Sequence, residues 1–157
     1  MRIVLKETDI KNIIEKLVNK IRRKNISDKS IILKMIDDEL QNLKCEVIHE
    51  KDSYKNYGDA SDYGYNSWIE FWQEHSPCGK FLNTIKICPC CGKPMNNPVG
   101  GHVQDAYGKE VFITPICHEC NSSAANNEEF RKTPFKVSQK YLLKFNYNEL
   151  RPLRHSK

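Results

Sequence analysis

Two pairs of cysteines with the spacing Cys-x-x-Cys are the residues of this chain whose types and spacing predict chemistry. The first pair is Cys88 and Cys91, and the second is Cys117 and Cys120. Each pair can present two thiolates to one ion, so the four together can form a tetrahedral zinc site. Four protein ligands leave no open position for water or substrate. We therefore expect a structural Zn²⁺ whose binding contributes to folding.

Three further cysteines bring the total to an odd number, seven. Cys90 lies inside the first pair and could replace a neighbour as ligand, but the pattern Cys-Pro-x-Cys-Gly favours Cys88 and Cys91. Cys45 and Cys78 have no partner at metal spacing. An odd count with metal spacing favours a reducing compartment over a disulfide scaffold, so we expect a cytoplasmic protein.

Composition limits the classes to which the chain can belong. At 157 residues and a mean hydropathy of −0.66, we expect a soluble protein with a modest core. No apolar run approaches the roughly 18 residues that span a bilayer, so we expect no membrane partner. The N-terminus mixes apolar and charged residues and has no small-residue cleavage site, which argues against a signal peptide.

The net charge of +5 is concentrated at the two ends of the chain. Residues 1–26 carry eight bases and three acids, and residues 131–157 carry eight bases and one acid. Basic ends around a near-neutral centre predict a polyanionic partner, most simply nucleic acid and in particular DNA. The alternative is that these lysines and arginines are only solvated.

Hydrophobic periodicity predicts the elements that must position the cysteines. A helix is expected over Thr8–Arg23 and a second one from near Asp28 or Ser30, with either Ser27 or Asp28 as the N-cap, and together they form a helical hairpin. The remaining expected elements are a short strand over Cys45–His49, a loop over residues 51–65, a helix over Asn66–His75 with two core tryptophans, a strand over Lys109–Ile113, and a helix over Cys120–Arg131. The segment Phe135–Phe145 fits either strand or helix.

The cysteine pairs, a histidine between them and an asparagine after the last cysteine resemble the cysteine-bearing HNH endonucleases, above all those of the recombination endonuclease VII type. The segments GGHV and FITPICHECN are also similar to those of small bacterial and phage HNH-like proteins. The likeness covers Trp68–Asn121. It implies a zinc-braced ββα-metal finger, treble-clef-like, so that the whole chain would be α+β with an added N-terminal helical hairpin.

The resemblance also implies a catalytic site. His102 corresponds to the general base that activates water for phosphodiester hydrolysis, and Asn121 to a ligand of a catalytic Mg²⁺ or Mn²⁺. The family usually places Asp or His directly before the histidine as a second ion ligand, and this chain has Gly101 there. Asp105 would supply that ligand if a hairpin turn brought it back.

These patterns predict three regions: residues 1–62, helical with an acidic loop; residues 63–130, the zinc-bound finger with its tryptophan-bearing lead helix; and residues 131–157, a basic tail. Three functions remain open. They are a divalent-metal-dependent endonuclease of HNH type, a non-catalytic zinc-finger module that binds nucleic acid or a protein partner, and a phage-type inhibitor that contacts a host protein through the helical hairpin.

Overall fold

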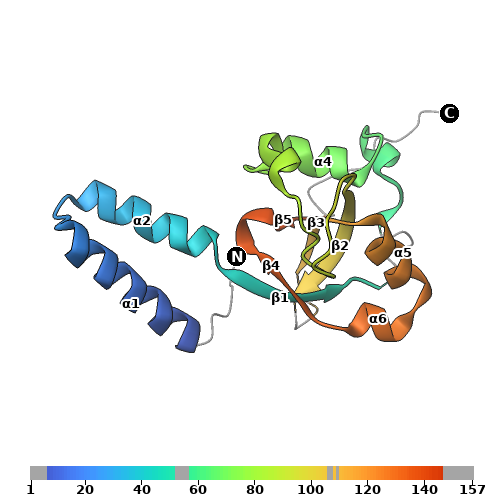
Figure 1. The fold of residues 1–157 in the computed structure, drawn as a ribbon. Coiled ribbons are helices and arrows are strands. Elements are labelled where there is room, and N and C mark those ends of the chain that lie inside the picture. The colour runs from blue at the N-terminus through green and yellow to red at the C-terminus, as the bar shows by residue number, and fades with distance from the viewer. Residues whose placement is uncertain (1–6, 52–56, 106–107, 109, 147–157) are drawn as a thin grey trace. The chain divides into compact units, whose positions relative to one another are not determined.

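The computed structural model describes residues 7–51, 57–105, 108 and 110–146 (Figure 1). It divides into two compact units, residues 1–43 and residues 44–157. The boundary therefore lies at residue 43, well before the expected one at residue 62. Among the described residues, no helix combines the length and the apolar character that crossing a membrane requires.

The first unit is a hairpin of two helices, α1 (Glu7–Lys24) and α2 (Lys29–Gln41). The turn between them uses Asn25 in the left-handed region, at φ 48°. Asp28 is the N-cap of α2, and its side chain accepts hydrogen bonds from the backbone N–H groups of Ser30 and Ile31. Leu17 and Met35 are buried. The predicted helical hairpin is confirmed, and of the two candidate caps, Ser27 and Asp28, the structure has Asp28.

The second unit is built on a five-stranded antiparallel sheet with the order β4-β1-β2-β3-β5. The strands, in sheet order, are β4 (Phe135–Ser138), β1 (Lys44–His49), β2 (Val99–Asp105), β3 (Val111–Ile116) and β5 (Leu143–Lys144). The segment that fitted either strand or helix thus forms two strands with the single turn η3 (Gln139–Tyr141) between them. Part of the expected basic tail belongs to the sheet.

Among the described residues, helices α4, α5 and α6 pack on this sheet (Figure 1). Helix α4 (Trp68–His75) lies against β2 and β3, α5 (His118–Asn126) contacts β2, and α6 (Glu128–Lys132) contacts β1. Two 3₁₀ turns, η1 (Ala60–Tyr63) and η2 (Gly79–Thr84), flank α4 in the chain. The helix expected over Cys120–Arg131 is divided into α5 and α6 because Asn127 has an extended backbone and caps α6.

Two buried clusters hold the second unit together. The larger one contains Trp72, which is fully buried, together with Cys88 and Cys120, so α4 and part of the cysteine cluster share one core. The Trp72 Nε1–H donates to the Tyr141 carbonyl oxygen at 2.9 Å. The smaller cluster contains residues of β1, β2, β3 and β4, namely Val47, Val103, Phe112, Phe135 and Val137. The fold is therefore mixed α/β, with an antiparallel sheet beside a four-cysteine cluster.

Candidate metal centre

The first cysteine pair lies on a tight turn between two short extended segments. Ile87 and Pro94 form an isolated bridge, and the Gly92 N–H donates to the Cys88 carbonyl oxygen at 2.9 Å. Gly92 has φ +72°, a conformation that a side chain would strain. We name this turn, residues 88–92, the knuckle. It places the side chains of Cys88 and Cys91 on the same side of the turn.

The second pair lies where β3 ends and α5 begins. Cys117 is the N-cap of α5, and its Sγ accepts a hydrogen bond from the Cys120 N–H at 3.4 Å. The Cys117 N–H in turn donates to the Sγ of Cys88 at 3.4 Å, which joins the two pairs. N–H groups at a helix N-terminus favour negative charge, so this position suits thiolates.

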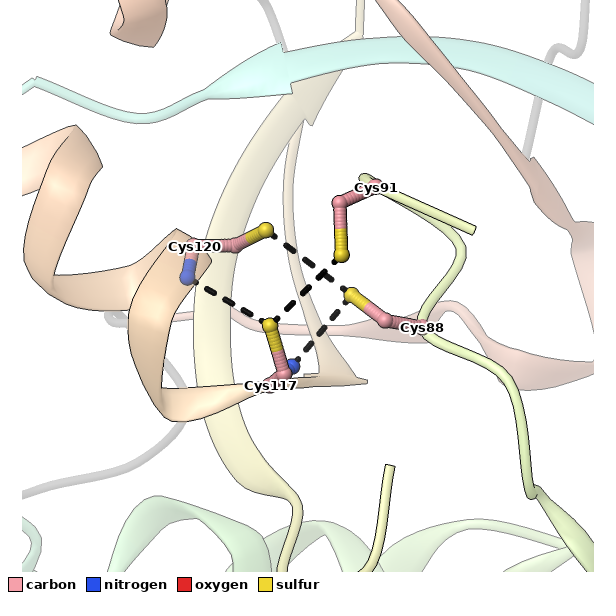
Figure 2. A group of neighbouring side chains, drawn as sticks. All are labelled: Cys88, Cys91, Cys117 and Cys120. Atoms are coloured by element: carbon pink, nitrogen blue, oxygen red, sulfur yellow. Dashed lines mark hydrogen bonds between the residues drawn. The ribbon is translucent and has the colours of Figure 1, made fainter. Parts of the chain in front are cut away.

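The four sulfur atoms converge on one point, as Figure 2 shows. All four lie within 4.8 Å of one another, with 4.0 Å between the sulfurs of Cys88 and Cys120 and 3.8 Å between those of Cys91 and Cys117. A tetrahedral zinc with Zn–S bonds of about 2.3 Å separates its sulfurs by about 3.8 Å. A disulfide would need about 2.05 Å. The donor set and its spacing fit Zn²⁺, and these four cysteines would hold it.

The electrostatics of the cluster also favour a cation. Burial raises the pKa of the Cys117 and Cys120 thiols, and hydrogen bonds with neighbouring sulfurs raise that of Cys120 further. For Cys91, burial acts to raise the pKa, but hydrogen bonds from the Lys93 N–H and the other thiols outweigh it and leave that pKa lowered. A dication at the centre would stabilise all four thiolates.

Cys90 has two neighbours: its thiol interacts with that of Cys120, and it also contacts a histidine of the sheet. Its Sγ lies 3.5 Å from Nε2 of His49, a residue of β1 that is only 3% exposed. Burial raises the pKa of Cys90 to about 11 and lowers that of His49 to about 4, so at neutral pH a thiol faces a neutral imidazole. This contact ties the knuckle to the sheet, and the group of four convergent sulfurs takes Cys88 and Cys91 from this turn.

His49 was not among the predicted site residues. Its ring stacks on Phe130 at 5.6 Å and lies 4.9 Å from Phe135. The period-two alternation of Val47 and His49 in the predicted strand was the available signal, because both side chains then point to the same buried face.

His102 lies in the middle of β2, with an exposed fraction of 8%. Three rings surround its own: Trp68 at 4.7 Å, and Tyr57 and Phe145 at 5.6 Å each. Its Nε2 is buried and has no hydrogen-bond partner within the described part of the chain. Burial lowers the pKa of His102 to about 4, so the imidazole is neutral.

Asn121 is exposed on α5 and lies near Gly101 rather than near the His102 ring. A Cβ added to Gly101 would lie 3.6 Å from the Asn121 Oδ1 and would overlap Ile116. Successive residues of a strand point to opposite faces of the sheet, so the side chain of His102 projects away from Asn121. The sheet therefore separates the expected general base from the expected ion ligand.

Asp105 lies at the end of β2, where it closes the turn to β3. Its N–H donates to the Glu110 carbonyl oxygen, and its Oδ1 accepts from the Glu110 N–H, each at 3.1 Å. Four residues of extended strand place it about 13 Å from Gly101. The turn thus does not bring Asp105 back toward Asn121. The structure does bring together the four predicted zinc ligands.

Comparison with known proteins found no relative of this chain. No family model, no curated protein and no solved structure matches it significantly.

Proposed function

We propose that this chain is a zinc-stabilised module that binds nucleic acid without cleaving it. The observation that carries the proposal is the set of four convergent sulfurs, which would hold Zn²⁺ with no position open for a substrate. The bound ion would join the knuckle to the start of α5 and so stabilise the surface around it.

The surface formed by the knuckle and the residues before it has a charge that suits a polyanionic partner. From Ser76 to Gln104 the chain contains three lysines and no Asp or Glu. Lys80 and Lys86 are exposed, and so are Phe81 at 51% and Ile87 at 54%. Exposed lysines provide contacts to phosphates, and an exposed aromatic ring can stack on a base.

The basic C-terminal segment is partly neutralised within its described residues. Lys132 pairs with Glu128 and Lys144 with Glu110, each at 2.6 Å. Arg131 donates to the Ala124 carbonyl oxygen at 3.2 Å. These contacts leave the knuckle surface, defined by Lys80, Phe81, Lys86 and Ile87, as the better supported contact region; the two basic ends would add non-specific affinity.

Binding is tested by fluorescence anisotropy with labelled single-stranded and duplex DNA and with RNA, from about 50 mM to about 200 mM salt. The double variant Lys80→Gln and Lys86→Gln should bind more weakly, and the slope of log Kd against log salt should fall by about 2. Lys29→Gln with Lys34→Gln removes two exposed lysines of α2 and should have a smaller effect. Equal losses in the two double variants would contradict the assignment to the knuckle surface.

A metal-dependent endonuclease of HNH type is the second candidate. It is favoured by one arrangement: the β2–β3 hairpin is followed directly by α5, and Asn121 on α5 lies against the residue before His102. In this hypothesis His102 is the general base, and Asn121 and Asp105 bind Mg²⁺ or Mn²⁺. We rank it second because the ring of His102 is enclosed by aromatic side chains on the other face of β2.

Cleavage is tested on plasmid, single-stranded and branched DNA with added Mg²⁺ or Mn²⁺. We expect no products from the wild-type protein. Cleavage that His102→Ala and Asn121→Ala each abolish, with zinc content unchanged, would establish the nuclease instead. Binding confined to a single protein, with little dependence on salt, would favour an inhibitor.

A further inference from the structure

The exposed hydrophobic side chains of this protein are concentrated on the helical hairpin. Among the described residues, eight large hydrophobic side chains are exposed, and six of them belong to α1 and α2. The stripe on α1 has the spacing i, i+4, i+8, and its members are Ile10 (42%), Ile14 (55%) and Val18 (37%). On α2, Leu33 (55%) and Leu40 (38%) are seven residues apart and therefore share one side of the helix.

Both stripes lie on the same face of the hairpin. Ile14 and Val18 lie about 60° and 100° around α1 from the buried Leu17, at 100° per residue. On α2 the less exposed residues Ile32, Met35, Ile36 and Glu39 define the side toward α1, and Leu33 and Leu40 lie about 90–110° from its centre in the same rotational sense. Because the two helices run antiparallel, equal senses of rotation from the shared seam lead to one side. We name this side, formed by Ile10, Ile14, Val18, Leu33 and Leu40, the hairpin face.

The hairpin cannot bury these residues by itself. It forms a compact unit of its own, and only Leu17 and Met35 are buried within its described residues. Units of about 40 residues usually need a metal, disulfides or association to be stable. The cysteine cluster belongs to the other unit and residues 1–43 contain no cysteine, so neither a metal nor a disulfide stabilises the hairpin.

The charges of the two helices favour a second copy as the partner. Helix α1 carries six bases and three acids, whereas α2 with its cap Asp28 carries four acids and two bases. Lys16 of α1 already pairs with Glu39 of α2 at 2.9 Å within one hairpin. A twofold axis parallel to the helices would place each α1 between two antiparallel α2 helices, so that unlike charges and opposed helix dipoles are neighbours.

We propose that the protein forms a homodimer in which two hairpin faces pack together as an antiparallel four-helix bundle. Both copies use the same face, so the interface is complete in a dimer and does not extend into a larger assembly. The apolar stripes of the four helices form the bundle core, and the charged edges remain in water. The proposal does not depend on nucleic-acid binding.

Sedimentation equilibrium of the full chain tests the proposal. The wild-type mass should be twice the 18.3 kDa of one chain. Ile14→Glu and Leu33→Glu each place a carboxylate in the bundle core, where it cannot be paired, and should raise the dimer dissociation constant at least tenfold. Circular dichroism compares the helix content of each variant with that of the wild type and so identifies a variant that has lost helical structure.

Ile31→Glu is the matched control. Ile31 is 48% exposed on α2 but lies about 160–180° around the helix from Leu33 and Leu40, outside the hairpin face. This variant should remain dimeric. A wild-type monomer at all accessible concentrations would overturn the proposal, as would equal dissociation by Ile31→Glu and Ile14→Glu.

Discussion

Gly101 and His102 are adjacent on β2, and the two positions have opposite surroundings. The Cα hydrogen of Gly101 faces Ile116, where a side chain would overlap, so packing accounts for the glycine. His102 faces three aromatic rings and is almost fully buried. An acidic ion ligand at position 101 would have to displace Ile116, a fully buried residue of the larger cluster.

The buried Nε2 of His102 predicts a stabilising substitution. A buried polar atom without a partner costs about 1–3 kcal/mol, so His102→Phe should raise the free energy of unfolding at pH 7 by about 1 kcal/mol. Urea unfolding monitored by tryptophan fluorescence measures this change. A loss of stability would show that the imidazole makes a favourable contact that a phenyl ring lacks.

The same substitution should change how stability depends on pH. His102 in the unfolded chain takes up a proton as pH falls below about 6.5, whereas the buried ring does so only near pH 4, because burial lowers its pKa to about 4. Above pH 6.5 this difference in protonation does not affect the free energy of unfolding. As pH falls from 6.5 toward 4, protonation of His102 in the unfolded chain progressively lowers the free energy of unfolding. His102→Phe should remove up to about 1.4 kcal/mol per pH unit from the slope in this window. His49 remains in both proteins and cancels in the comparison.

At the scale of elements, one turn and the start of one helix form the four-cysteine cluster. The knuckle presents Cys88 and Cys91, and the N-terminus of α5 presents Cys117 and Cys120. The Cys-x-x-Cys spacing was enough to predict these four residues, because each pair needs only a local turn. The role of Cys90 was left open by the sequence, since its contact with His49 joins residues 41 positions apart.

Neighbouring cysteines of the knuckle should therefore respond differently to substitution. Elemental analysis should give one zinc per chain for the wild type and for Cys90→Ser. Cys91→Ser should lower zinc affinity and, by hydrogen exchange, reduce the protection of residues 86–95, because a thiolate ligand is lost. Equal zinc loss in both variants would show that Cys90 is itself a ligand.

At the scale of the whole molecule, residues 1–43 and residues 44–157 form separate compact units with different means of stabilisation. The second unit has two hydrophobic clusters and a cysteine cluster. The hairpin has a wide apolar face instead, and its periodicity was visible in the sequence. How much of that face would be exposed was not visible, because exposure depends on which neighbours the helix has.

The sequence by itself predicted the four clustered cysteines and the two hairpin helices, and it narrowed the cap of the second helix to Ser27 or Asp28. Each of these follows from residues close together in the chain, for which spacing and local hydrogen bonding are sufficient. Only the tertiary structure decided the five-stranded sheet, the partner of Cys90, and the opposite orientations of His102 and Asn121. Those depend on strand register, which brings distant segments together and sets the face to which each side chain points.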